Sequence, residues 1–252
     1  MNNVLRINNL SKAYYSLKGE IKAIDNFSLD VSSGDYISII GSSGCGKSTI
    51  LNILSLLDKD YDGEILFKSK DIKVGYMLQD DSLFDWLTVY QNAIIGLKIK
   101  HLLTKENIDY VKSLLIKYGL KDFMNKYPSS LSGGMRQRVA LIRTLAIKPD
   151  ILLLDEPFSA LDYQTRLKVG DDVYRIIKEE NKTVIMVTHD IAEAVSMSDK
   201  VVVLSKRPCK IKNVYDIKLA NKDTPINNRK DEKFAYYYDQ LWRDLDEAIW
   251  IY

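Results

Sequence analysis

Four short apolar runs lie along the chain, separated by stretches with a helical repeat. The runs are YISII (36 to 40), ILLL (151 to 154), TVIMV before Thr188, and VVVL (201 to 204). Continuous runs rich in β-branched residues and leucine are typical of strands buried on both faces of a sheet. Helical spacing occupies 48 to 57 and 164 to 180. The pattern therefore predicts an α/β fold with a parallel sheet covered by helices.

The middle of the chain has a different character. LTVYQNAIIGLKIKHLL and TKENIDYVKSLLIKYGL show helical spacing, and no strand-like run occurs between residue 80 and Ile151. We therefore expect an inserted helical subdomain at about 80 to 148. In front of the core, LRINNLSKAYY and EIKAIDNFSLDV alternate apolar and polar residues, as strands with one solvated face do. This predicts an antiparallel β subdomain over about residues 1 to 35, within a single domain spanning 1 to 252.

The tail, from about 207 to 252, is basic and polar at first and ends in KFAYYYDQLWRDLDEAIWIY. Apolar residues recur in this last stretch at helical spacing, which predicts an amphipathic closing helix. They are Phe234, Tyr238, Leu241, Leu245 and Ile249. Packing of this face on its own domain is the favoured interpretation, and a partner-binding face is the alternative.

Composition and charge exclude several classes of protein. Hydrophobic residues make up 46% of the chain, as in ordinary globular proteins, and 36 basic residues stand against 34 acidic ones. This balance gives no overall field that would attract nucleic acid or an anionic membrane. The apolar runs are far shorter than the roughly 18 residues of a membrane span. The first residues lack a secretory signal, which predicts a cytosolic protein in which Cys45 and Cys209 are free thiols.

A glycine-rich loop, GSSGCGKST, directly follows the first apolar run. It satisfies the pattern G-x-x-x-x-G-K-[ST], in which glycines let backbone N–H groups surround a polyphosphate at the positive end of a helix dipole. Lys47 then reaches the β and γ phosphates of ATP, and the Ser48 hydroxyl can ligate Mg²⁺. A tight turn that binds nothing is the alternative. The residues assigned to the nucleotide are Gly41, Ser42, Ser43, Gly44, Cys45, Gly46, Lys47, Ser48 and Thr49.

Two carboxylates, Asp155 and Glu156, directly follow ILLL. Ligands of parallel sheets collect at the carboxyl ends of the strands, so both side chains should face the crevice that holds the phosphate loop. Asp155 fits a magnesium-holding role, usually through a water, and Glu156 is then free to polarise the attacking water. The alternative is that these acids only cap the next helix.

His189 and Gln79 each end an apolar run that is directed at the same region. His189 follows TVIMVT, and Gln79 follows VGYML. Taken alone, a histidine at a strand end is more often structural, and a glutamine there commonly makes a surface hydrogen bond. Their position after apolar runs nevertheless places both near the proposed γ-phosphate.

A second glycine pair opens the helical stretch LSGGMRQRVALIRTL, at 131 to 145. Ser132 can cap this helix, and Gly133 and Gly134 expose its first N–H groups, which makes an anion site. Because this site follows the helical insertion rather than a core strand, it need not face its own phosphate loop. The economical solution is a head-to-tail dimer in which it closes over ATP held by a second copy. The alternative is a capped helix that packs Met135, Val139, Ile142 and Ala146 inward.

The order of these motifs, with SALD at 159 to 162, resembles that of the ATP-binding cassette (ABC) ATPases over nearly the whole chain. The resemblance implies a P-loop NTPase (RecA-like) core that binds ATP and Mg²⁺. It implies that Asp162 belongs to a loop coupling the two sites and that Tyr14, or alternatively Tyr15, stacks on adenine, a contact worth roughly 1 to 3 kcal/mol. The signature acting in trans is then Ser132, Gly133, Gly134 and Gln137. With the resemblance, the expected catalytic residues are Glu156, His189 and Gln79, and the expected metal ligands are Ser48, Gln79 and Asp155.

A narrower resemblance concerns the importers of nitrate, sulfonate and taurine. LSGGMRQRVAL, DWLTVYQN and LSKRPCKI look like their cassettes, although those usually have proline where Asp85 stands and glycine where Cys209 stands. The resemblance implies an importer subunit on the inner face of the cell membrane that powers separate permease subunits, with an extracytoplasmic solute-binding protein delivering a small anionic solute. The alternatives are a non-transport cassette acting on nucleic acid or ribosomes, which usually has two cassettes or a coiled-coil insertion, and a small-molecule kinase.

Overall fold

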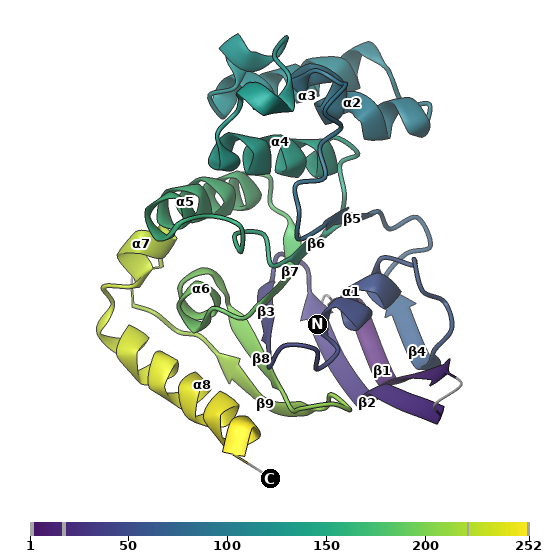
Figure 1. Ribbon diagram of the computed structural model, residues 1–252, viewed down its shortest axis with the longest axis vertical. Coiled ribbons are helices and arrows are strands. Elements are labelled where there is room, and N and C mark those ends of the chain that lie inside the picture. Colours follow the sequence, from purple (N-terminus) through teal and green to yellow (C-terminus); the bar gives the residue numbers. More distant parts are fainter. Residues whose placement is uncertain (1–2, 17–18, 221, 251–252) are drawn as a thin grey trace.

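The computed structural model describes residues 3–16, 19–220 and 222–250 of the chain. Its larger sheet has the strand order β5-β6-β7-β3-β8-β9, with β9 antiparallel to β8 and the other five strands parallel (Figure 1). The strands are β3 (Tyr36–Ile40), β5 (Val74–Met77), β6 (Ile151–Asp155), β7 (Thr183–Thr188), β8 (Lys200–Leu204) and β9 (Ile211–Asp216). The four strands predicted from apolar runs are confirmed, and every residue of β3, β6 and β7 is buried.

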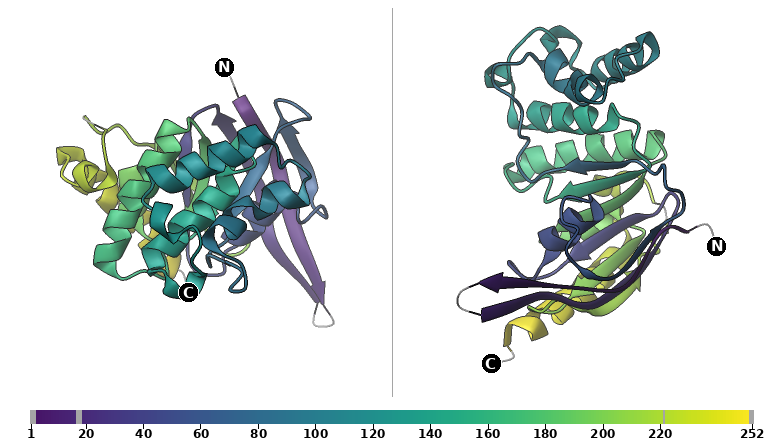
Figure 2. Two further views of the ribbon diagram at one scale, coloured as in Figure 1. Left: turned by 90° about the horizontal axis from the view of Figure 1, so that it is seen from above. Right: turned by 90° about the vertical axis from the view of Figure 1, so that its right-hand side faces the viewer.

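A second, three-stranded antiparallel sheet lies beside the N-terminal part of the core. It consists of β1 (Asn3–Ser16), β2 (Gly19–Ser32) and β4 (Asp62–Phe67), in the order β2-β1-β4. Figure 2 shows β1 and β2 as a long hairpin that extends beyond the body of the molecule. The alternating pattern predicted β1 and β2 but not β4. Strand β4 is exposed along most of its length, so it carries no apolar run that would mark it.

Eight α-helices connect and cover the strands in the described part of the chain. They are α1 (Lys47–Leu54), α2 (Val89–Ile99), α3 (Lys105–Lys117), α4 (Gly133–Leu145), α5 (Tyr163–Glu179), α6 (Ile191–Met197), α7 (Pro225–Asn228) and α8 (Glu232–Trp250). Short 3-10 turns span Lys121–Phe123 and Pro128–Ser130. Helices α2, α3 and α4 gather at one end of the molecule, with α5 between them and the sheet (Figure 1). None of these helices is both long enough and apolar enough to cross a membrane.

The apolar face of α4 is directed into the core, as predicted. Val139, Ile142 and Ala146 are buried, and Met135 packs against the same cluster from a partly buried position. This cluster contains residues of helices α2, α3, α4 and α5 and of one face of the large sheet. A second cluster lies between the other face of that sheet and the antiparallel sheet. The helical layer is therefore fixed to the core through α4 and α5.

Two predicted elements have different bounds in the structure. The helix expected over 48 to 57 corresponds to α1, which ends earlier, at Leu54. It ends there because Leu56 adopts a positive φ of 64°, which interrupts helical geometry. The tail contains β9 and α7 before its closing helix. Strand β9 was missed because it lies at the sheet edge and none of its residues is fully buried, so it carries no continuous apolar run.

The closing helix α8 is confirmed, and it packs on its own domain. Leu241 is fully buried, and Phe234, Tyr238 and Leu245 pack against the apolar cluster formed by α6 and β8. The side chain of Ile249, the last position of the predicted stripe, lies outside the described residues. The favoured interpretation of this face is therefore correct for its described part.

Candidate nucleotide-binding site

The glycine-rich loop connects the carboxyl end of β3 to the first turn of α1, so the start of this helix is directed at the loop. Gly46 precedes the helix with φ 132°, and an added Cβ atom would lie 3.0 Å from both the Ala23 carbonyl oxygen and the Cys209 sulfur. A side chain at this position would meet fixed backbone and would hold a strained conformation. The loop therefore requires a glycine here.

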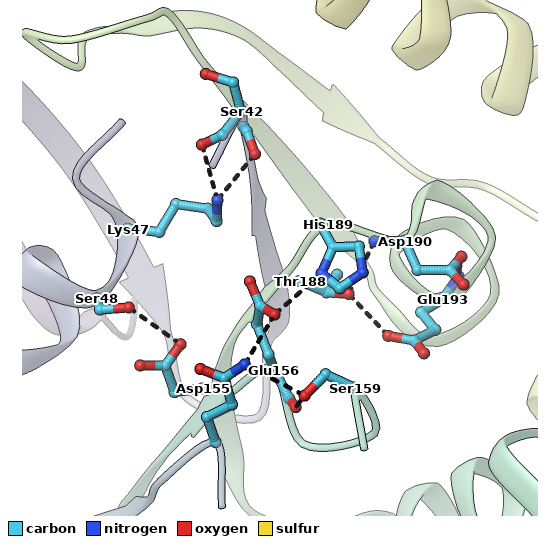
Figure 3. A network of polar contacts seen from close by, with 12 residues as sticks. Ser42, Lys47, Ser48, Asp155, Glu156, Ser159, Thr188, His189, Asp190 and Glu193 are labelled. Atoms are coloured by element: carbon cyan, nitrogen blue, oxygen red, sulfur yellow. Dashed lines mark hydrogen bonds and ion pairs between the residues drawn. The ribbon is translucent and has the colours of Figure 1, made fainter. Parts of the chain in front are cut away.

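The Lys47 ammonium lies inside the loop. Its Nζ donates to the carbonyl oxygens of Gly41 and Ser42, at 2.9 and 3.0 Å (Figure 3). The side chain is largely buried, with 6% exposure, so the loop backbone holds the cation at its centre. This position suits a side chain that binds phosphate oxygens.

Asp155 ends β6 beside the first turn of α1. The Ser48 hydroxyl donates to Asp155 Oδ1 at 3.4 Å, and the Tyr76 hydroxyl donates to Oδ2 at 3.2 Å. Burial raises the pKa of Asp155, while the two hydroxyl groups oppose that shift. A hydroxyl oxygen beside a carboxylate is a donor set that fits Mg²⁺, which keeps several waters and takes few protein ligands. No group of three or more acidic, histidine or cysteine side chains that could hold a metal by themselves occurs in the described chain.

Glu156 follows Asp155 at the same strand end and adopts the left-handed region, with φ 43°. Its carboxylate lies 3.0 Å from His189 Nδ1 and 3.5 Å from Gln79 Nε2 (Figure 3). The Gln79 amide also donates to Ser159 at 3.4 Å. The structure thus brings the three predicted catalytic side chains together, and it places Gln79 against Glu156 rather than against Asp155.

A cavity of about 570 Å³ opens over the loop. It extends from Tyr14 and Ile21 on the antiparallel sheet to Gln79 and Glu156 at the edge of the large sheet. Of the two candidate adenine-stacking residues, Tyr14 lines this cavity, whereas the neighbouring Tyr15 does not and is 78% exposed. The remaining lining residues are Ala23, Ser43, Gly44, Gly46, Lys47, Ser48, Thr49 and Arg207.

A smaller cavity, of about 210 Å³, adjoins the other side of the loop. Gly41, Ser42 and His189 line it together with Trp242 and Leu245 from α8. The closing helix therefore borders the part of the loop that faces His189.

The two cysteines are free thiols, as predicted, and both are buried. Cys45 packs into the core behind the loop, so only its backbone can face a ligand. Burial raises the pKa of Cys45 and raises that of Cys209 to about 12. The thiols contribute packing behind the phosphate loop.

The second glycine site lies apart from this cavity. Ser132 caps α4 by accepting the Met135 N–H at 3.4 Å, as predicted. Gly133 and Gln137 line a different cavity, of about 520 Å³, with Asp81 and Leu161. The Gln137 side-chain oxygen is buried and has no hydrogen-bond partner among the described residues. Residues 131 to 137 contribute nothing to the lining of the cavity around Lys47.

The two glycines of this site have different surroundings. An added Cβ at Gly134 would lie 2.6 Å from the Val169 Cγ2 atom on α5, closer than real contacts allow, whereas Gly133 is exposed. Gly134 therefore has a packing role between α4 and α5 that the sequence did not reveal. Asp162 has a structural role as well, because its carboxylate caps α5 by accepting the Thr165 N–H at 3.1 Å.

Sequence reasoning missed two residues of this site. The Tyr76 hydroxyl donates a hydrogen bond to Asp155. Tyr76 lies only three residues before Gln79, and this proximity could have marked it as a residue of the site. Arg207 lines the cavity from the segment after β8, where the sequence indicated only a basic tail.

The sequence profile of the ABC transporter family matches residues 24–159, which include the phosphate loop, the second glycine pair and both carboxylates. The chain is 42% identical to the uncharacterized ABC transporter ATP-binding protein YtlC of Bacillus subtilis, over 96% of this chain and 95% of the relative. It is 40% identical to the aliphatic sulfonates import ATP-binding protein SsuB of Bacillus cereus, over 84% and 86%. It is 36% identical to the nitrate import ATP-binding protein NrtD of Synechocystis, over 94% and 93%.

A solved structure gives the same result for the fold. The dimeric ATP-binding cassette MJ0796, in a post-hydrolysis state bound to ADP and Pi, superposes with a TM-score of 0.72 and 31% identity, over 85% of this chain and 99% of that chain. The predicted P-loop NTPase fold is thereby confirmed. The chain belongs to the ABC transporter family, and it is an ATP-binding cassette ATPase.

Proposed function

We propose that this chain is the ATP-hydrolysing subunit of an importer, in which it powers the uptake of a small anionic solute through separate membrane subunits. The import proteins SsuB and NrtD, which match more than four fifths of the chain, support the direction of transport and the class of solute. The observation that carries the mechanism is the separation of the two glycine sites, which line different cavities of one chain.

Within one site, the loop backbone and Lys47 bind the phosphates, and Tyr14 stacks on the adenine. Ser48 and Asp155 would hold Mg²⁺, which would supply charge neutralisation at the phosphate oxygens. Glu156 accepts a proton from the attacking water, and His189 keeps its carboxylate oriented through the 3.0 Å contact. Gln79 bonds the same carboxylate and so connects it to the segment that follows β5.

Two copies complete the site. The Ser132 helix start of one chain approaches the γ-phosphate held by the other, and the reverse contact forms the second site of a head-to-tail homodimer. The exposed N–H groups at the start of α4 supply the anion-binding end of a helix dipole. A dimeric cassette is described for MJ0796, which supports this arrangement.

The permease contact lies at the cavity between the helical layer and the core. This cavity is lined by residues that directly follow Gln79, among them Asp80 and Asp85, and the adjacent Phe84 and Trp86 rings are exposed and lie 5.1 Å apart. Because Gln79 begins this segment, a change at Glu156 is transmitted to the docking surface. The chain then lies peripherally on the inner face of the cell membrane, and an extracytoplasmic solute-binding protein delivers the solute to the permease.

Mixing two inactive variants tests the shared site. Lys47→Ala and Ser132→Arg each damage one half of it, so each variant alone should lack ATPase activity, whereas their heterodimer retains one intact composite site. We expect the mixture to bind one ATP per dimer and to regain part of the turnover. Lys47→Ala mixed with the Lys47→Ala/Ser132→Arg double variant is the matched control, because no intact site can form. If the mixture hydrolysed ATP no faster than this control at any ratio, the dimer proposal would be wrong.

A further inference from the structure

The segment after β8 returns to the phosphate loop and places Arg207 against it. Arg207 Nε and Nη2 donate to the Gly44 carbonyl oxygen, at 3.1 and 2.6 Å. Gly44 adopts a positive φ of 70°, and the side chain of Arg207 lines the same cavity as Tyr14 and Lys47. Arg207 thus contacts the loop at Gly44, whereas Asp155 ends β6 and Glu156 follows it.

This segment is fixed on β2 rather than being part of a free tail. The Cys209 N–H donates to the Ala23 carbonyl at 2.9 Å, and the Asp25 N–H donates to the Cys209 carbonyl at 3.0 Å. Lys210 adds an ion pair with Asp25 at 2.6 Å. The Arg207 backbone is therefore anchored two residues away by a short stretch of strand-like pairing.

The charge of the cavity also depends on Arg207. Among the residues that line the cavity, the cationic side chains are Lys47 and Arg207, and the acidic one is Glu156. A guanidinium has five N–H donors in a rigid fork, and the Gly44 carbonyl takes two of them. The group can therefore hold the loop and still present charge to a phosphate.

We infer that Arg207 is a nucleotide-binding residue of this ATPase: it positions the phosphate loop through Gly44 and supplies a second cation for the polyphosphate of ATP. The inference rests on the ATP site described under the proposed function, but it does not require the dimer or the permease. Charge-assisted hydrogen bonds are worth about 1.5 to 3 kcal/mol, which corresponds to roughly a tenfold to a hundredfold change in affinity.

Three substitutions separate positioning from charge. Arg207→Ala removes both, Arg207→Gln keeps an N–H donor without charge, and Arg207→Lys keeps the charge without the paired donation. Kd should be measured by calorimetry for ATP, ADP and adenosine, at low and high salt. We expect Arg207→Ala to raise the Kd for ATP about tenfold, to raise that for adenosine far less, and to flatten the salt dependence. Arg207→Lys should restore the salt dependence, and Arg207→Gln should not.

Steady-state kinetics provide the second measurement. Arg207→Ala should raise KM for ATP with kcat changed less than about twofold, because the reacting groups lie at the strand ends. Lys206→Ala is the matched control, since Lys206 does not line the cavity. If Arg207→Ala kept the wild-type Kd and KM, or weakened ATP and adenosine equally, the inference would be overturned. A wild-type chain that failed to bind ATP would instead contradict the proposed function.

Discussion

His189 Nδ1 and the Glu156 carboxylate lie 3.0 Å apart, at the carboxyl ends of the adjacent strands β7 and β6. Glu156 reaches this position through a left-handed backbone conformation that a non-glycine residue rarely adopts. The two side chains face the loop that holds Lys47 (Figure 3). The proposed proton acceptor and the group proposed to orient it therefore lie side by side at the ends of adjacent strands.

Replacing Glu156 with glutamine should nearly abolish ATP hydrolysis while leaving ATP binding intact. An amide cannot accept the proton of water, and general-base catalysis typically contributes about 10² to 10⁴ in rate. The same variant should accumulate as an ATP-bound dimer, which size-exclusion chromatography would detect. Glu64→Gln, which changes an exposed carboxylate on β4, is the control. Turnover within a factor of two of the wild type would remove the assignment of Glu156 as the base.

The two histidines of the chain provide a matched pair. His189→Ala removes the group that orients Glu156, so kcat should fall by at least about tenfold with little change in the Kd for ATP. His101→Ala alters an exposed residue after α2 and should leave kcat unchanged. A colorimetric phosphate assay at saturating ATP measures both variants. Equal effects of the two substitutions would contradict the role of His189.

Gly134 and Val169 should behave as a coupled pair. Gly134→Ala places a methyl group against Val169, so we expect a loss of about 1 to 3 kcal/mol in the free energy of unfolding. Adding Val169→Ala makes room for that methyl group, so the double variant should be more stable than the sum of the two single changes predicts. Urea unfolding of the four proteins measures the coupling. Strict additivity would show that the close approach does not limit packing.

Glu193 gives the stability of the protein a dependence on pH. Burial on α6 and the neighbouring Asp190 raise its pKa to about 7, against the opposing effects of the Thr188 hydroxyl, Arg166 and Arg229. Because the folded-state pKa is raised, the cost of the buried carboxylate is fully present above pH 7 and disappears as the pH falls toward 4.5.

Glu193→Gln should therefore stabilise the protein at pH 8, by roughly 1 to 3 kcal/mol, and much less at pH 5. Urea unfolding at the two pH values measures this difference. Glu232→Gln at the exposed start of α8 should show no such dependence. A gain from Glu193→Gln that was the same at both pH values would rule out titration of the carboxyl group.

The sequence predicted the features that depend on residue type at a fixed spacing. The phosphate loop, the acidic strand end and the Ser132 cap are of this kind, because each depends on neighbours within a few residues. Strands β4 and β9 could not be recognised, since they lie at sheet edges and lack a continuous apolar run.

Other features depend on contacts between residues distant in sequence. The close approach of Gly134 to Val169 and the support of Asp155 by Tyr76 exist only once helices and strands are packed. The preference for Tyr14 over Tyr15 likewise required the cavity, because both residues lie on the same strand. The roles of residues in local motifs could therefore be predicted from the sequence, whereas the packing and the cavities around them could not.

Ser42, His189 and Trp242 line the same small cavity, so the closing helix borders the phosphate loop. We expect a triphosphate bound to the loop to alter the surroundings of the Trp242 indole, and its fluorescence should then respond to ATP. A variant that keeps Trp242 but carries Trp86→Phe and Trp250→Phe isolates this signal from the other two tryptophans of the chain. Emission that shifts with ATP in this variant, and not in one that also carries Lys47→Ala, would let occupancy be followed in real time without a label.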